Sequence, residues 1–177
     1  MAEYEYVLDR DDVLQWVSDT WLRFAEENEA SGMRPELILG RSLWDFIGCA
    51  KTRYLYEHLF ATARDDTRSV SVPFRCDAPG LRRFMRLKIS PEDDHSLRIL
   101  VRLEREEPRD QVEFLEPGDA QPHELMKMCS WCRRVRSGEE WKEVEEVIAN
   151  RRLFKGDPLP AISHGVCPDC FDGVLET

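Results

Sequence analysis

The chain has 177 residues, of which 42% are hydrophobic and 34% charged, and its formal net charge is −10. This hydrophobic content is enough for a buried core and excludes a disordered chain, while the acidic balance disfavours a general nucleic-acid binder, which needs a basic face. No apolar run is long enough to span a membrane, and the acidic start at residues 1–5 does not resemble a signal peptide, so we expect a cytoplasmic protein with no membrane contact.

The first 28 residues predict two short strands followed by a helix. We expect strands at residues 4–8 and 13–17, joined by a turn-like acidic segment. Either Ser18 or Asp19 can cap a helix over residues 20–28, because both side chains accept hydrogen bonds from first-turn amides.

The middle of the chain predicts a longer helix and three strands. The expected ranges are 52–65 for the helix and 69–76, 84–89 and 97–103 for the strands. Within each strand apolar residues alternate with polar ones, which is typical of an antiparallel sheet with one covered and one exposed face. We place Arg75 on the exposed face, with the other Arg and Lys residues of these strands.

This order of elements predicts an α+β fold, and two of its segments resemble a PAS domain, a sensor fold of about this length. One is Val13–Phe24, a strand followed by a polar pair and an aromatic-bearing helix; the other is Leu39–Ile47, which is similar to the family's G-x-x-L-x-D-x-I pattern. Ser18-Asp19 stands where the family often has Asn. The resemblance covers residues 4–106 and implies a five-stranded antiparallel sheet with helices on one face, a small-molecule ligand or protein partner, and self-association as a homodimer.

Composition divides the chain into three parts. We expect a PAS-like sensor domain over residues 1–107, a charged and proline-rich linker over 108–122, and a small zinc-binding domain over 123–177.

Four cysteines near the C-terminus form two Cys-x-x-Cys hooks, Cys129/Cys132 and Cys167/Cys170. A two-residue gap lets both sulfurs of a tight turn point at one ion, so two hooks complete the tetrahedral shell of a structural Zn²⁺. A redox pair or a disulfide is the alternative. His164 is a competing candidate, either as a direct ligand in place of one sulfur or as a group that packs beside the site.

The zinc segment has a resemblance of its own. Residues 129–136, a helix-like run over 141–148 that contains Trp141, and residues 163–170 are similar to a tail found on bacterial sensor and response proteins, behind PAS, GAF or receiver modules. Pro168 suits the first turn of a final helix. We expect a treble-clef-like or ribbon-like site, with the hook at 129–132 in a turn and the hook at 167–170 at a helix N-terminus.

Three arginines, Arg133, Arg134 and Arg136, follow the first hook directly. They could contact an acidic partner or a phosphate, but nearby glutamates favour a solvated face with local ion pairs.

The sequence disfavours haem and flavin in the sensor part. His58 lies on the helix where haem-binding PAS domains place an axial ligand, yet a surface or core-edge histidine explains it better. The segment Ser42–Ile47 lacks the reactive cysteine of flavin photosensors, and Cys49 and Cys76 are most simply small hydrophobic residues.

These observations favour a non-catalytic sensory or regulatory protein with a structural zinc site and a protein partner in a signalling pathway. One alternative is a transcription-related regulator whose zinc domain contacts nucleic acid. Another is an enzyme that uses zinc or a thiol, although the sequence contains no phosphate-cradling loop, nucleophile elbow or His-Glu-x-x-His motif.

Overall fold

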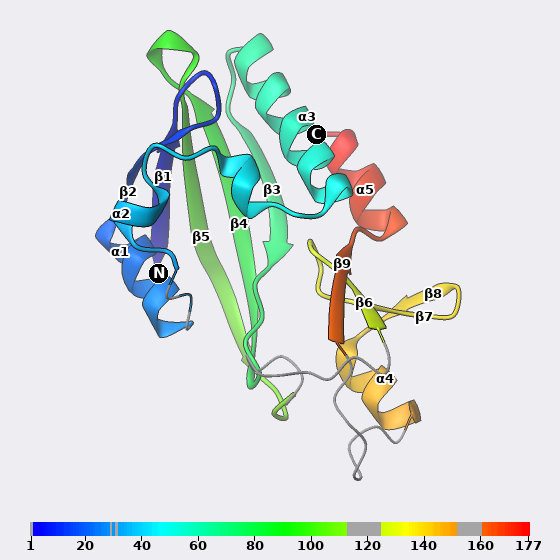
Figure 1. Cartoon of the computed structure of the whole chain (residues 1–177). Coiled ribbons are helices and arrows are strands. Elements are labelled where there is room, and N and C mark those ends of the chain that lie inside the picture. Colours follow the sequence, from blue (N-terminus) through cyan, green and yellow to red (C-terminus); the bar gives the residue numbers. More distant parts are fainter. Residues whose placement is uncertain (1, 29, 31, 113–124, 152–160) are drawn as a thin grey trace.

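The computed structural model describes residues 2–28, 30, 32–112, 125–151 and 161–177, which form two sheets, five α-helices and two 3-10 helices (Figure 1). The larger sheet is five-stranded and antiparallel, with strand order β2-β1-β5-β4-β3. Its strands are β1 (Glu3–Leu8), β2 (Leu14–Val17), β3 (Val70–Arg75), β4 (Leu81–Pro91) and β5 (Leu97–Pro108). The predicted PAS-like α+β class is therefore confirmed.

Helices cover one face of this sheet (Figure 1). They are α1 (Asp19–Glu27), α2 (Pro35–Ile38), the 3-10 helix η1 (Leu43–Phe46) and α3 (Ala50–Asp65). Ser18 caps α1, because its hydroxyl accepts a hydrogen bond from the Trp21 amide. On α3 the buried residues Leu55, Leu59 and Ala63 recur every four positions, so a single stripe of this helix faces the sheet.

The core lies between the helices and the covered face of the sheet. The strands contribute the inward members of their alternating pattern, for example Val72, Leu87 and Ile99, each at most 3% exposed. Phe60 of α3 is 1% exposed and packs among them. The period-2 pattern of the sequence thus sets which face of the sheet is covered.

Arg75 does not follow this pattern, and its predicted exposure was wrong. Strict alternation would leave it in solvent, yet it is 8% exposed. The reason is that β3 is an edge strand and the C-terminal domain lies against its end, where Asp77 and Glu143 pair with the guanidinium.

The smaller sheet has four strands in the order β8-β7-β6-β9, with β6 and β9 parallel and the other pairs antiparallel. Its elements are β6 (Leu125–Cys129), β7 (Val135–Ser137), β8 (Glu140–Lys142), α4 (Val144–Arg151), β9 (Ala161–Gly165) and α5 (Pro168–Leu175). The expected helix over 141–148 begins too early, since Trp141 lies in β8. Gly138, with a φ of +63°, closes the β7–β8 hairpin first, and α4 starts after it.

The two sheets share one hydrophobic cluster. Trp131, Val166 and Val174 of the C-terminal part pack in the same cluster as the buried residues of the larger sheet and α3. Helix α5 also lies beside α3 (Figure 1), where the rings of Tyr54 and Phe171 stack with their centroids 5.8 Å apart.

Of the predicted linker over 108–122, the part from 113 onward lies outside the described residues. Its described beginning is packed against the larger sheet. The Arg109 side chain is 3% exposed, and the buried Val112 donates its amide to the carbonyl of Pro79 at 3.0 Å. Within the described ranges, no helix combines the length and the apolar character needed to cross a bilayer.

Candidate metal centre

The first cysteine hook is a tight turn at the end of β6. The Cys129 amide donates to the carbonyl of Arg134 at 2.8 Å, and the Arg133 amide donates back to the carbonyl of Cys129 at 3.1 Å. Arg133 adopts a φ of +62°, the left-handed conformation that closes the turn. This backbone places the sulfurs of Cys129 and Cys132 on one side of the turn, as the two-residue spacing predicts.

The second hook opens helix α5. Cys167 is the N-cap residue, Pro168 occupies the first helical position as predicted, and Cys170 follows in the first turn. The Cys167 amide donates to the sulfur of Cys129 at 3.3 Å, which ties the two hooks together. The unpaired amides of a helix N-terminus favour negative charge, and so they favour thiolates at this position.

The structure brings all four sulfurs together, within 4.8 Å of one another. The sulfurs of Cys132 and Cys167 are 3.7 Å apart. Tetrahedral Zn²⁺ with Zn–S bonds of about 2.3 Å requires sulfur–sulfur distances of about 3.8 Å, whereas a disulfide bond is about 2.05 Å long. The cluster therefore has the dimensions of a four-thiolate zinc site.

The short distances between the sulfurs shift the pKa values of three of the four thiols. The thiols of Cys132 and Cys170 donate hydrogen bonds to the sulfur of Cys129, which lowers the pKa of Cys129. Each donor would give up its hydrogen bond on losing its proton, so the pKa of Cys132 is raised to about 12 and that of Cys170 is raised further. Four thiolates this close repel one another, so ionisation of the whole cluster requires added positive charge. A divalent ion would supply that charge and hold all four sulfurs in the ionised form.

His164 is not one of the clustered donors. It lies on β9 with its side chain exposed, and the metal-binding group found among the described residues consists of the four cysteines. Partial burial and the positive charge of Arg133 both lower its pKa. Its ring lines an open cavity beside the first hook instead.

The first hook is fastened to the edge of the larger sheet through Trp131. The indole Nε1 donates to the carbonyl of Pro73 at 2.7 Å, and the Arg75 amide donates to the carbonyl of Trp131 at 2.8 Å. The Trp131 ring is 5% exposed and contacts the rings of Tyr56 and Phe74, at centroid distances of 5.6 and 6.4 Å. The turn that carries two of the cysteines thus covers the end of β3.

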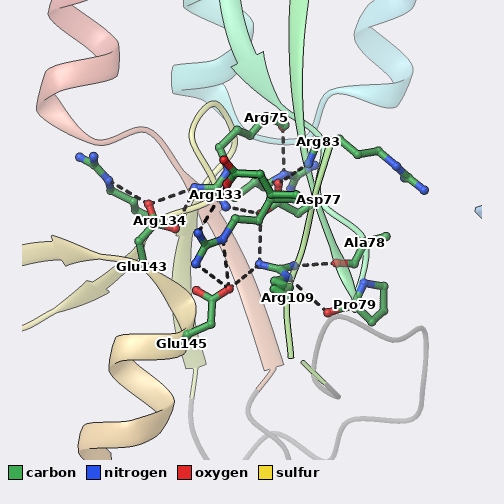
Figure 2. A network of polar contacts seen from close by, with 12 residues as sticks. Arg75, Asp77, Ala78, Pro79, Arg83, Arg109, Arg133, Arg134, Glu143 and Glu145 are labelled. Atoms are coloured by element: carbon green, nitrogen blue, oxygen red, sulfur yellow. Dashed lines mark hydrogen bonds and ion pairs between the residues drawn. The ribbon is translucent and has the colours of Figure 1, made fainter. Parts of the chain in front are cut away.

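Arg75 also belongs to a network of buried and half-buried charged side chains (Figure 2). Arg75 donates to both carboxylate oxygens of Glu143, at 3.0 and 2.8 Å, and pairs with Asp77. Arg109 bridges Asp77 and Glu145 at 3.2 Å each. Burial opposes the charge of Arg75, but hydrogen bonds to Asp77 and Glu143 dominate and raise its pKa. Glu143 and Glu145 stand at the start of α4, so the network joins the two sheets.

Sequence reasoning missed both contacts. The signal for Trp131 was a large apolar residue inside a four-residue metal hook, where the turn alone requires none. The signal for the network was Asp77 in a turn two residues after Arg75. Pro73, the hydrogen-bond partner of the Trp131 indole, lies 58 positions away in the sequence. Glu143, the distant partner of Arg75, lies 68 positions away.

The other arginines and the candidate cofactor residues are less organised. Arg134 pairs with Glu143 and Asp169, and Arg136 pairs with Glu139, as the local-pair interpretation predicts. His58 is half-buried on α3, away from the cysteine cluster.

No family profile matches the chain, and no curated protein matches its sequence. Several solved structures are similar. A domain of an HTR-like protein from Haloarcula marismortui has 12% identity and a TM-score of 0.45, covering 59% of this chain and all of that one. A sensory box sensor histidine kinase from Vibrio cholerae has 11% identity and a TM-score of 0.41, covering 57% and 80%. The PAS domain of Bordetella pertussis BvgS has 15% identity and a TM-score of 0.39, covering 58% and 73%. Because these scores are low, the fold assignment rests on the strand order and the covering helices.

Proposed function

We propose that the chain is a sensory or regulatory protein, in which a PAS-like domain and a structural zinc domain act as one unit toward a protein partner in a signalling pathway. The observation that carries this proposal is the docking of the first hook on β3. The turn that holds Cys129 and Cys132 also supplies Trp131, which is hydrogen-bonded to Pro73 and Arg75. The metal therefore fixes the surface that the sheet domain presents at its edge.

The donor set supports a structural role over a catalytic one. Four thiolates fill the tetrahedral shell of Zn²⁺ and leave no position for water or substrate. Bound zinc would supply positive charge and a cross-link between β6 and α5, without activating a nucleophile.

The metal content tests this proposal directly. Natively purified protein is expected to contain about one zinc per chain by elemental analysis, because the four cysteines form one site. A Cys167→Ser variant should lose most of that zinc, while the matched Cys76→Ser variant, which changes a cysteine outside the cluster, should keep it. Metal-free protein that is fully folded would falsify the structural zinc site.

A role in transcription, with the zinc domain in contact with nucleic acid, has weaker support. Two of the three arginines after the first hook already pair with carboxylates, and the chain is acidic throughout. Phosphate contacts would make binding depend on salt. A salt titration with random DNA decides the matter, since binding that weakens steeply with salt would favour this role over a protein partner.

A further inference from the structure

An open cavity of about 460 Å³ lies between the two parts of the molecule. One side is formed by the start of α3, with Cys49, Thr52 and Tyr56. The other side is formed by the first hook and β9, with Ser130, Arg133 and His164. A volume of several hundred cubic ångströms suits a small organic molecule.

Arg133 is the cationic side chain that lines this cavity. Arg133 uses its Nε to donate to the carbonyl of Arg75 at 3.3 Å, and within the described residues no carboxylate reaches ion-pair distance of its guanidinium. Its neighbour Arg134 pairs with both Glu143 and Asp169. Arg133 is half-buried and lines the cavity, so its guanidinium is available to pair with an anion that enters it.

The opposite wall also favours an anion. Helix α3 is 16 residues long, Cys49 gives its N-cap no side-chain hydrogen bond, and its first turn contains no acidic residue. Thr52, in that turn, is 8% exposed. Among the described residues its hydroxyl has no hydrogen-bond partner and almost no accessible surface, so it lies behind the cavity wall. The first-turn amides of a helix are groups that bind oxyanions in proteins.

We propose that this cavity binds a small organic anion, with its acidic group between Arg133 and the N-terminus of α3. Ser130 would donate a hydrogen bond to it, and the side chains of Phe46 and Ile47 would contact its apolar part. The inference rests on the proposed function, because Arg133 is placed by the zinc-bound hook. Such a ligand contacts both parts of the molecule at once, so its binding stabilises their docked arrangement.

Two probes distinguish the chemistry of the acidic group. Phenyl phosphate and benzoate share an apolar ring and differ in the anion, and benzamide is the neutral control. Titrated into zinc-loaded ¹⁵N-labelled full-length protein, an anion is expected to shift the amide signals of residues 50–52 and 130–133 in a saturable manner. A shift by phenyl phosphate alone would assign a phosphate ligand, and a shift by benzoate alone a carboxylate.

Matched variants locate the site. Arg133→Gln should weaken binding of the effective probe at least about tenfold, the usual cost of losing a charge-assisted hydrogen bond. Arg136→Gln removes a charge of the same hairpin that pairs with Glu139 and should leave binding unchanged. Ser130→Ala, which removes the hydroxyl on the cavity wall, should weaken binding several-fold. Zinc content and the dispersion of amide signals are measured for every variant.

The outcomes separate this inference from the function on which it rests. Zinc-loaded protein that binds neither anion, or that binds equally well after Arg133→Gln, overturns the anion site and leaves the zinc-dependent unit intact. Binding of benzamide as strong as that of benzoate also overturns it. Protein that folds without zinc overturns both proposals.

Discussion

At the scale of single residues, Trp131 has a structural role that its position in a metal hook does not suggest. Trp131→Ala should lower the free energy of unfolding by about 3–5 kcal/mol, the range for a fully packed tryptophan. Trp131→Phe retains a ring and loses the hydrogen bond to Pro73, so a loss of about 1 kcal/mol beyond any packing change is expected. Urea denaturation measures both.

The control for this prediction is Trp16, which lies on β2 and is 44% exposed. Trp16→Ala should cost clearly less than Trp131→Ala, since 44% of the Trp16 surface is already exposed to solvent and Trp131 is 5% exposed. Equal losses for the two alanine variants would contradict the anchoring role of Trp131.

Asp77 is the residue on which the buried charges depend. Its side chain is 1% exposed and it contacts both Arg75 and Arg109. Asp77→Asn would leave two buried guanidinium groups with less negative charge, and a loss of about 3–5 kcal/mol is expected. Glu104→Gln, which breaks an exposed pair with Arg86, should cost at most about 1 kcal/mol. Similar losses in thermal denaturation would refute the importance of burial here.

Residue patterns in the sequence predicted some of this site and not the rest. The cysteine spacing is sufficient to place four sulfurs together, because a two-residue hook has few conformations. Arg75 could not be placed by alternation, because its surroundings are set by Glu143, which comes 68 residues later. In the sequence Arg133 cannot be distinguished from Arg134 and Arg136, which pair with carboxylates. Whether a carboxylate lies within reach of Arg133 depends on where the folded chain places the turn.

At the scale of elements, the edge of β3 is where the first cysteine hook packs against the larger sheet. With zinc bound, the Arg75 amide donates to Trp131 and should exchange slowly with solvent. Removal of zinc by a chelator should raise its exchange rate, because the hook loses its fixed turn. The amide of Leu87 in the interior strand β4 is the internal control and should stay protected. Unchanged protection of Arg75 would show that docking does not need the metal.

Substitution of two glycines by alanine is expected to change the stability of the protein in opposite directions. Gly138 has a φ of +63° in the β7–β8 turn, so Gly138→Ala should destabilise the protein by about 1–2 kcal/mol. Gly173 lies inside α5, and an added methyl group there meets no atom within 4 Å, so Gly173→Ala should stabilise by about 0.5–1 kcal/mol. Denaturation midpoints compare them, and a shift in the same direction would contradict the assigned backbone conformations.

Element boundaries were predictable where local signals are strong. Ser18 and Pro168 mark the starts of α1 and α5 because capping and the fixed φ of proline act locally. The start of α4 was misplaced because Trp141 and Val144 have helical spacing, while the hairpin that includes Trp141 depends on pairing of β7 with β8.

At the scale of the whole molecule, the two predicted domains share a core and a buried charge network. Zinc release and loss of the larger sheet are therefore expected to coincide on heating. Tryptophan fluorescence and a zinc-sensitive dye, recorded in one thermal scan, would report both events. A zinc signal that rises well before the sheet unfolds would show that the parts are independent.

The docking of Trp131 on Pro73 also bears on how the chain folds as it is synthesised. The ribosome completes the last strand of the larger sheet at Pro108, and 62 further residues, roughly 3–12 seconds of synthesis, separate it from Cys170, the last of the four cysteines. During that interval the outer edge of β3 has unpaired backbone groups, and Arg75 lacks Glu143. A nascent chain in that state is open to strand pairing with another chain, and the arrival of zinc at the last two cysteines ends the exposure.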